Sequence, residues 1–342
     1  MTGRGDPSDI LDAARRGDEN AFAALVRPYR RELHGLCYRM LGSVDDADDT
    51  VQEVLVRAWR GLAAFQGRSS VRTWLFRIAT NACLSRLAGR PARTVPLELG
   101  PPAGIGEGPG EMLDRSIWLA PYPDRLLVDD EAGRPEAVAE RMESVELAFL
   151  AALHRLSPKA RAVLILRAVL AFSAQETADA LGLSVAAVNS SLQRARAAVK
   201  LQVPTRTQQE TTRELGEGRV RELVSRYARA LAERDVPALL ELLHDDATWC
   251  MPPMPAWYQG KEAIACFLRH VAFRSRWRHL PTRANGQPAV GCYMWVELEG
   301  AYVAAALDVL TLAGDRIAAV TAFVDPRAVA VCGLPERLPR DT

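Results

Sequence analysis

Hydrophobic residues recur every three or four positions over long stretches of this chain, a spacing that predicts amphipathic helices. The helical pattern runs from about residue 8 to residue 87 and returns from residue 135 to residue 201. Residues 88–134 lack it, and their Gly- and Pro-rich stretch Gly100–Gly110 predicts a flexible linker. The polar run Pro204–Thr212 is either a second joint or an extension of a helix.

A different pattern begins near residue 214. One helix, with apolar positions between Val220 and Leu231, leads into segments that Gly or Asp turns separate. These segments predict the strands Ala247–Cys250, Tyr293–Leu298, Tyr302–Leu312 and Ile317–Val324. A helix followed by several strands is typical of an α+β domain. We therefore expect a multidomain chain in which two all-α parts precede a separate α+β part.

Residues 173–196 predict two short helices around a tight turn. Ser173 and Glu176 have the spacing of a capping box, Gly182 can end the first helix and Ser184 can begin the second. The apolar residues expected to face the core are Val188, Leu192, Ala195 and Val199. Such a helix-turn-helix fits the DNA major groove. The second helix carries few charges, and a helical hairpin packed in a bundle is the alternative.

An acidic cluster lies at the predicted start of the helix that continues to Trp59. Its members are Asp45, Asp46, Asp48 and Asp49. Acidic side chains stabilise the positive end of a helix dipole, which explains the cluster without any partner. The functional interpretation is a docking face for a basic partner surface. The residues alone favour the dipole explanation.

The stretch from Phe65 to Arg86 interleaves arginines with aromatic residues. It contains Arg68, Arg72, Arg77 and Arg86, the aromatic residues Phe65, Trp74 and Phe76, and Asn81. Single-stranded DNA is bound by cations that track phosphates and by rings that stack on bases. The alternative is that Trp74 fills a core while the arginines are solvated, and both interpretations can hold for different residues.

Composition limits the classes of function. The chain has 342 residues, of which 49% are hydrophobic and 25% charged, as in globular proteins of two or three domains. A net charge of +1 means that DNA contacts must come from local patches with the help of a partner. The six cysteines have no metal-binding spacing, so we expect free thiols and no cofactor. No signal peptide or membrane span is visible, which predicts a cytoplasmic protein without a membrane partner.

Three of these motifs, in this order, resemble the extracytoplasmic-function (ECF) group of bacterial RNA polymerase sigma factors. Asp45–Trp59 resembles the core-polymerase-binding helix, and Arg72–Asn81 resembles the segment that melts and reads the promoter −10 element. Leu156–Leu164 and the helix-turn-helix after it resemble the −35-reading domain. The resemblance implies an alternative sigma factor, not an enzyme, which binds core polymerase and directs promoter recognition, DNA melting and transcription initiation.

The resemblance also implies roles for individual residues. The partners would be core RNA polymerase, through its largest and second-largest subunits, and promoter DNA, both duplex and melted. Core polymerase would contact Asp45, Asp46, Asp48, Asp49, Gln52, Glu53 and Arg57. The melted −10 element would contact Phe65, Arg68, Arg72, Trp74, Arg77, Asn81 and Arg86. The −35 element would contact Ser184, Ala187, Asn189, Ser190, Arg194 and Arg196, a set with less charge than the family often carries there.

Leu239–Ile264 resembles the start of a SnoaL-like domain, a cone-shaped α+β fold with a curved sheet around a pocket. Several sigma factors of this group carry such a domain, and its presence implies intramolecular regulation. The pocket, for a small molecule or an intramolecular ligand, would be lined by Trp249, Trp257, Tyr258, Trp295 and Asp308. Asp245 and Asp246 are interpreted as turn residues.

The expected domains are residues 1–90 (sigma region 2), 91–134 (flexible linker), 135–203 (sigma region 4) and 214–335 (SnoaL-like regulatory domain). Two other functions stay open. One is a one-component, ligand-sensing regulator that binds duplex DNA without polymerase, which leaves the acidic cluster and the Arg–aromatic stretch unexplained. The other is an isomerase-like enzyme fused to a helix-turn-helix, with Asp308 as its general base.

Overall fold

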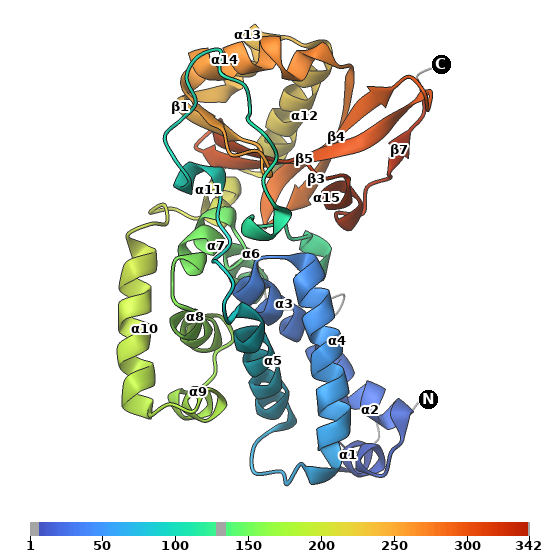
Figure 1. Cartoon of the computed structure of the whole chain (residues 1–342), viewed down its shortest axis with the longest axis vertical. Coiled ribbons are helices and arrows are strands. Elements are labelled where there is room, and N and C mark those ends of the chain that lie inside the picture. Colours follow the sequence, from blue (N-terminus) through green and yellow to red (C-terminus); the bar gives the residue numbers. More distant parts are fainter. Residues whose placement is uncertain (1–6, 128–134, 341–342) are drawn as a thin grey trace. The chain divides into compact units, whose positions relative to one another are not determined.

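The computed structural model describes residues 7–127 and 135–340. The chain divides into two compact units, each described here by itself (Figure 1). Unit 1 combines the chain up to Ala92 with Ala152–Leu201. Unit 2 combines Arg93–Ala151 with the chain from Gln202 onward. The helix-turn-helix therefore shares a unit with the N-terminal helices, whereas the expected linker shares a unit with the C-terminal domain.

Unit 1 is helical in the part that the structure describes. Its N-terminal helices are α1 (Pro7–Arg15), α2 (Glu19–Val26), α3 (Arg30–Leu41), α4 (Val44–Gly61) and α5 (Val71–Leu87). Its later helices are the end of α7 (Leu147–His154), α8 (Pro158–Leu164), the π-helical turn η6 (Ile165–Val169), α9 (Ala174–Leu181) and α10 (Val185–Lys200). Helices α3, α4 and α5 pack on one another around fully buried Leu33, Leu36, Val54 and Phe76, as in the helical bundle that the sequence predicts.

Local signals set the ends of the functional helices. Ser43 caps α4 by accepting from the Asp46 backbone N–H. Ser173 and Glu176 form the predicted capping box of α9, and Gly182 ends that helix in the left-handed conformation, with φ 63°. Ser184 caps α10, whose four predicted core residues are buried. These findings confirm the predicted helix-turn-helix.

Unit 2 is built on a mixed sheet of seven strands in the order β2-β1-β6-β5-β4-β3, with β7 paired to β5. The strands are β1 (Leu243–Cys250), β2 (Trp257–Gln259), β3 (Trp277–Ala284), β4 (Gln287–Val296), β5 (Ala301–Ala313), β6 (Arg316–Phe323) and β7 (Arg337–Leu338). Strand β1 runs parallel to β6, and the other pairs are antiparallel. The four predicted strands are confirmed, whereas β2, β3 and β7 were not predicted.

Helices cover both faces of this sheet. One face packs against α12 (Glu217–Glu233), α13 (Val236–Leu242) and α14 (Gly260–His270), around a core that includes Trp249 and Leu310 (Figure 1). The other face packs against α15 (Pro326–Val331) around Tyr293 and Leu307. Helices α6 (Pro135–Glu143) and α11 (Gln208–Leu215) complete the unit. This is the expected α+β domain.

Two local predictions differ from the structure. Asp245 and Asp246 lie inside β1, where pairing with β6 shifts register between Leu243 and Thr248, so they occupy an irregularity of a strand rather than a turn. The polar run Pro204–Thr212 contains both a short connection and the start of α11, because Thr207 and Glu210 form a capping box there.

The predicted flexible linker also differs. Residues 93–127, the linker strap, contain no α-helix, as their composition indicates, yet hydrogen bonds fix them to the rest of unit 2. Thr94 pairs with Trp118 in an isolated bridge, and Trp118, Leu119 and Tyr122 are buried. Gly and Pro therefore prevent regular structure here without leaving the backbone free. Residues 128–134 of the expected linker lie outside the described residues.

All six cysteines are free thiols. No group of His, Cys, Asp and Glu within the described ranges is arranged to hold a metal ion. Among the helices that the structure describes, none has the length and apolar character needed to cross a membrane.

Candidate nucleic-acid and polymerase interface

The acidic cluster forms one exposed face at the start of α4. Asp45, Asp48 and Asp49 are exposed, and Asp46 is half-buried. Arg86, at the end of α5, lies 3.4 Å from Asp46 and 3.6 Å from Asp49. The structure thus brings Arg86 to the acidic cluster, apart from the other residues predicted to read the −10 element.

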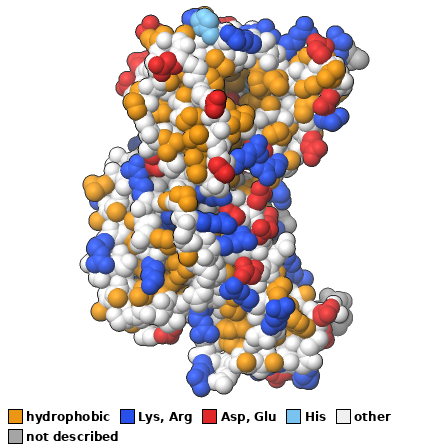
Figure 2. All heavy atoms as spheres, in the orientation of Figure 1, with side chains coloured by type: hydrophobic (Ala, Val, Ile, Leu, Met, Phe, Trp, Pro, Cys, Tyr) orange, Lys and Arg blue, Asp and Glu red, His pale blue; other side chains and the backbone are white. Residues whose placement is uncertain are grey.

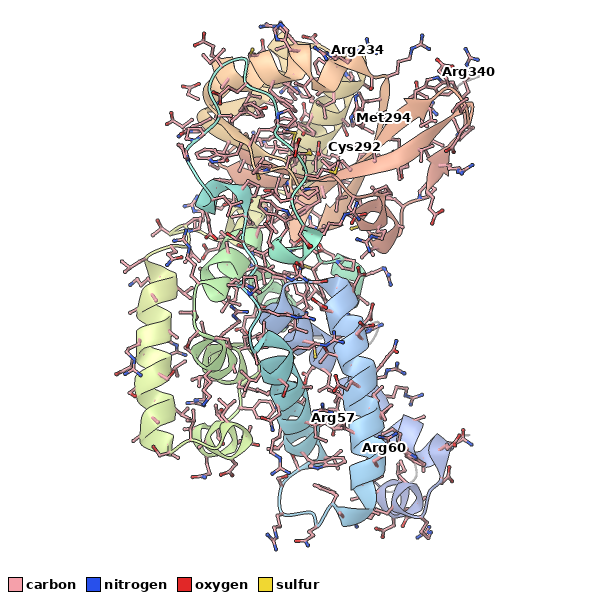
Figure 3. The ribbon with its side chains drawn as sticks, in the orientation of Figure 1. Arg57, Arg60, Arg234, Cys292, Met294 and Arg340 are labelled. Atoms are coloured by element: carbon pink, nitrogen blue, oxygen red, sulfur yellow. The ribbon has the colours of Figure 1, made fainter. Side chains whose placement is uncertain are left out.

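The remaining residues predicted to contact polymerase continue along α4. Gln52 is exposed, and the guanidinium of Arg57 pairs with the carboxylate of Glu53 one turn earlier. Figure 3 places Arg57 and Arg60 toward the C-terminal end of α4, and Arg57 lines a cleft together with Trp74 and Arg77 of α5. Arg57 therefore lies nearer to α5 than to the acidic cluster.

The residues predicted to read the −10 element separate into buried and exposed groups. Phe65 and Trp74 are buried, with ring centroids 4.9 Å apart, so they support the loop between α4 and α5 in this conformation. Arg68, Arg77 and Asn81 are exposed. The structure therefore supports the packing interpretation for the two rings and leaves the three polar side chains available to a ligand.

A cleft lies between α5 and the end of α9. Trp74, Arg77 and Asn81 line it on the α5 side, together with Arg57 of α4. Asp179–Gly182 line the opposite side. Residues of α5 that the sequence assigns to the −10 element thus line one cleft with the end of the first helix of the helix-turn-helix, within a single unit.

Arg72 is held by groups from both parts of unit 1. Its Nε lies 3.1 Å from a carboxylate oxygen of Glu32, and a terminal nitrogen donates to the Leu170 carbonyl at 3.0 Å. The guanidinium carbon lies 5.1 Å from the ring centroid of Phe76 and 4.3 Å from that of Phe172. Rings and acceptors thus surround this cation, which the sequence assigns to DNA.

Thr73 extends the same contact. Its hydroxyl donates to a carboxylate oxygen of Glu176 at 2.9 Å. Glu176 also accepts the Ser173 backbone N–H in the capping box, and hydrogen bonds from Ser173, and then from Thr73, hold the pKa of this carboxyl below its usual range. Glu176 therefore caps α9 and binds α5 at the same time.

Helix α10 presents the residues predicted for the −35 element. Asn189, Arg194 and Arg196 are exposed, whereas Ser184 is occupied as the helix cap and the Ser190 hydroxyl donates to the Ala187 carbonyl at 3.2 Å. Figure 2 shows separate Lys and Arg side chains around this helix rather than one basic patch. Its surface can approach DNA, with few cations to contact phosphates.

The structure brings three of the five predicted pocket residues of unit 2 together: Trp249 and Tyr258 pair across β1 and β2, and Asp308 binds Tyr227, whose ring stacks on Trp249. Trp249 and Tyr258 lie in the core under α12–α14. Trp257 donates from its indole nitrogen to the Gly100 carbonyl of the linker strap at 2.9 Å. Trp295 packs 5.1 Å from Tyr302, centroid to centroid, near the core on the opposite face of the sheet. The pattern could not reveal this separation, because it depends on which strand face each residue occupies.

Asp308 is buried on β5 and accepts a hydrogen bond from the Tyr227 hydroxyl at 2.8 Å. Burial raises the pKa of the Asp308 carboxyl to about 6, and the hydrogen bonds from Tyr227 and Cys292 oppose this shift. Figure 3 shows Cys292 on the neighbouring strand β4. A carboxyl with these partners is a satisfied core group, which supports a structural role.

The turn between β3 and β4 is a site that the sequence analysis missed. Asn285 is fully buried, with φ 57°, and its carbonyl oxygen accepts the Tyr122 backbone N–H at 2.9 Å. Its amide nitrogen donates to the Val145 carbonyl at 2.7 Å. We call this group, Asn285 with Tyr122 and Val145, the Asn285 clasp. The Asn-Gly pair predicts a hairpin turn, but no local signal shows that the turn holds the end of the linker strap and a residue shortly before α7.

Further bonds fasten the middle of the linker strap. The Ala103 N–H donates to the Trp257 carbonyl at 2.8 Å, and the Tyr258 hydroxyl donates to the Glu107 carbonyl at 3.0 Å. The Leu113 backbone N–H donates to the Pro253 carbonyl at 3.0 Å. These bonds satisfy backbone groups that Gly and Pro exclude from helices and strands.

Comparison with known proteins agrees with this geometry. Residues 25–91 match Sigma-70 region 2, residues 146–199 match Sigma-70 region 4, and residues 224–320 match a SnoaL-like domain. The chain is 43% identical to the ECF RNA polymerase sigma factor SigG of Mycobacterium tuberculosis over 329 residues, which cover 95% of this chain and 86% of SigG. The chain belongs to the ECF RNA polymerase sigma factors.

Two further ECF sigma factors show how the resemblance is distributed. SigW of Bacillus subtilis is 28% identical over 194 residues, 56% of this chain and 94% of SigW. The crystal structure of the M. tuberculosis ECF sigma factor SigJ covers 92% of this chain and 100% of its own, with a TM-score of 0.58 and 21% identity, and so supports the fold. In this ECF sigma factor, region 2 comprises α3–α5 and region 4 includes α8–α10.

Proposed function

We propose that this chain is a promoter-specificity subunit of RNA polymerase whose C-terminal domain regulates it through the linker. The acidic start of α4, with Gln52, Glu53 and Arg57, contacts the polymerase core through its largest and second-largest subunits. Arg68, Arg77 and Asn81 contact the melted −10 strand, and α10 enters the −35 major groove. The chain performs no catalysis and acts in the cytoplasm, where polymerase is.

One observation carries the proposal: the same unit presents a capped helix-turn-helix and an exposed acidic helix start. A one-component regulator needs the first feature and has no use for the second. Helix α10 has few cations to release counterions from DNA, so its own affinity for duplex should be low. Attachment to polymerase and the −10 contacts would raise its effective concentration at the −35 element.

The test of polymerase docking is a charge reversal. Asp49→Lys places a cation in the acidic cluster and should weaken binding to core polymerase, measured by pull-down with purified core enzyme. Glu19→Lys is the matched control, because Glu19 is an exposed acidic residue in the first turn of another helix of unit 1. Equal retention of both variants and the unchanged chain would reject the acidic face as the docking site.

The Asn285 clasp supports regulation through the linker. Residues 88–146 connect α5 to α7 and, fully extended, would reach about 200 Å. Thr94 is paired with Trp118, and Tyr122 and Val145 both bind the side chain of Asn285. These contacts shorten the path from α5 to α7 to about 50 Å, the sum of the extended lengths of residues 88–94 and 118–122, the spacing of one β-bridge and the width of the Asn285 side chain. The C-terminal domain thus limits how far regions 2 and 4 can separate.

Run-off transcription with core polymerase on a library of promoters tests the whole proposal. The full chain should start transcripts at a subset of promoters, and a chain truncated near residue 205 should give a different yield. Transcription by neither chain would refute the sigma function. Equal yields from both chains would refute regulation by the C-terminal domain and leave the sigma function intact.

A further inference from the structure

Arg15, at the end of α1, binds the loop that carries Arg68. This loop, residues 62–70, connects α4 to α5 and begins with a 3₁₀ turn. A terminal nitrogen of Arg15 donates to the Phe65 carbonyl at 2.6 Å, and the guanidinium carbon lies 5.8 Å from the centroid of the Phe65 ring. The other terminal nitrogen donates to a carboxylate oxygen of Asp12 at 3.1 Å. One side chain of α1 thus holds a residue that lies 50 positions later in the chain.

Helix α1 is itself fixed to the helices of region 2. It packs on α2, and Phe22 of α2 lies against Trp59 of α4, with ring centroids 5.0 Å apart. Asp12 lies three positions before Arg15 and orients its guanidinium, although so exposed an ion pair adds little stability. The two N-terminal helices therefore support the loop from outside the segment that matches Sigma-70 region 2, which begins at residue 25.

The loop is anchored at both ends and exposed in the middle. At one end, Phe65 packs on Trp74 of α5, with ring centroids 4.9 Å apart. At the other end, Ser70 caps α5 by accepting from a backbone N–H of that helix. Residues 66–69 lie between these anchors and are exposed, Arg68 among them. The direction in which Arg68 leaves the surface therefore depends on how firmly Phe65 is held.

We infer that Arg15 is a positioning residue for promoter reading, which holds the loop between α4 and α5 in the form in which Arg68 meets the melted −10 strand. The inference rests on the proposed function, which assigns Arg68 to that strand. A loop that is ordered before DNA binds loses little conformational freedom on binding, so its affinity for DNA is higher. The guanidinium of Arg15 is engaged by Phe65 and Asp12, so it acts through the loop rather than by touching DNA.

The contact depends on the shape of a guanidinium. Its planar fork reaches the Phe65 carbonyl and Asp12 at once, whereas the compact ammonium of lysine cannot keep both bonds with the same geometry. Arg15→Ala removes the whole contact, and Arg15→Lys keeps the charge and part of the contact. Arg16→Ala is the matched control, because Arg16 is the neighbouring arginine, is exposed, and makes no side-chain hydrogen bond or ion pair with any residue that the structure describes.

The affinity of the full chain for single-stranded DNA tests the inference. The probe is a fluorescein-labelled DNA of about 20 nucleotides of mixed sequence, followed by anisotropy. Arg15→Ala should weaken the apparent Kd about ten-fold, the factor that corresponds to ordering the backbone of about one more residue on binding. Arg15→Lys should lie between this variant and the unchanged chain, and Arg16→Ala should bind as the unchanged chain does. Hydrogen exchange of residues 62–70 should be faster in Arg15→Ala and should slow again when the probe saturates it.

Three readouts separate positioning from a direct DNA contact and from a general loss of stability. The slope of log Kd against log salt should be the same for Arg15→Ala and the unchanged chain, whereas loss of a direct phosphate contact would reduce it by about 0.7. Retention on core polymerase should not change, because the acidic start of α4 is separated from the loop by the length of that helix, about 27 Å. In a double-mutant cycle, Arg15→Ala should have little effect once Arg68→Ala has removed the side chain that the loop presents.

Each other result has a defined meaning. If Arg15→Ala binds the probe as the unchanged chain does while Arg68→Ala binds it more weakly, the positioning role is refuted and the sigma function stands. Equal losses in Arg15→Ala and Arg16→Ala, or a reduced salt slope in Arg15→Ala, would refute it in favour of a direct effect of charge. If Arg68→Ala binds as the unchanged chain does, the assignment of the loop to DNA fails, and the role of Arg15 fails with it.

Discussion

The Asn285 clasp can be opened by one substitution at a position outside the sigma regions. Asn285→Gly removes the hydrogen bonds that the Asn285 side chain makes with the Tyr122 N–H and the Val145 carbonyl. Each unsatisfied buried group costs about 2 kcal/mol, so the docked linker should lose about 4 kcal/mol. The bond from the Asn285 N–H to the Tyr122 carbonyl, 2.8 Å, is independent of the side chain and should survive.

Asn285→Ala separates the backbone effect from the hydrogen bonds. Alanine loses the same bonds and must also adopt the left-handed conformation at φ 57°, which costs it about 1 kcal/mol more than glycine. The expected order of linker release is therefore the natural chain, then Asn285→Gly, then Asn285→Ala. A difference of about 4 kcal/mol corresponds to about a thousand-fold increase in local opening.

Hydrogen exchange measured by mass spectrometry reads this opening directly. Peptides covering residues 118–127 should exchange much faster in both variants, while peptides from α5 in unit 1 should keep their rates. In run-off transcription, both variants should change the yield in the same direction as truncation near residue 205. Unchanged protection of residues 118–127 in Asn285→Gly would show that the clasp does not hold the linker.

Three further substitutions have outcomes that the structure specifies. Burial raises the pKa of Asp308 to about 6 from 3.8 in the unfolded chain, so its contribution to the free energy of unfolding is complete below pH 4 and about 3 kcal/mol is lost as pH rises through 6. Asp308→Asn should therefore make the free energy of urea unfolding nearly constant between pH 4 and pH 8. The same dependence on pH in the variant and the natural chain would contradict this role of Asp308. Arg161→Met removes buried bonds to the Met40 and Leu153 carbonyls, and calorimetry should show unit 1 destabilised by about 3 kcal/mol; a loss below about 1 would mean that the carbonyls find other donors. Ala171→Gly removes the cost of the left-handed conformation at Ala171 and should raise the free energy of unfolding by about 0.5 kcal/mol, seen as a slightly higher melting temperature. A lower melting temperature would argue against strain at this turn.

Features encoded by neighbouring residues could be predicted from the sequence. The capping box of Ser173 and Glu176 and the glycine that ends α9 lie within a few positions of each other, so their pattern defines the helix-turn-helix by itself. The acidic start of α4 was visible for the same reason. Strand β3 was missed because Pro281 and three basic residues hide its alternation.

Features that depend on distant partners could not be predicted. Arg72 lies in a stretch of arginines and aromatic residues that is typical of DNA binding. In the fold it binds Glu32 and Leu170, which lie 40 and 98 positions away in the chain. Composition indicated that residues 93–127 form no α-helix, but could not show that a turn at Asn285 holds them. The −10 set was likewise drawn from one continuous segment, whereas the fold assigns Arg86 to the acidic face and buries Trp74.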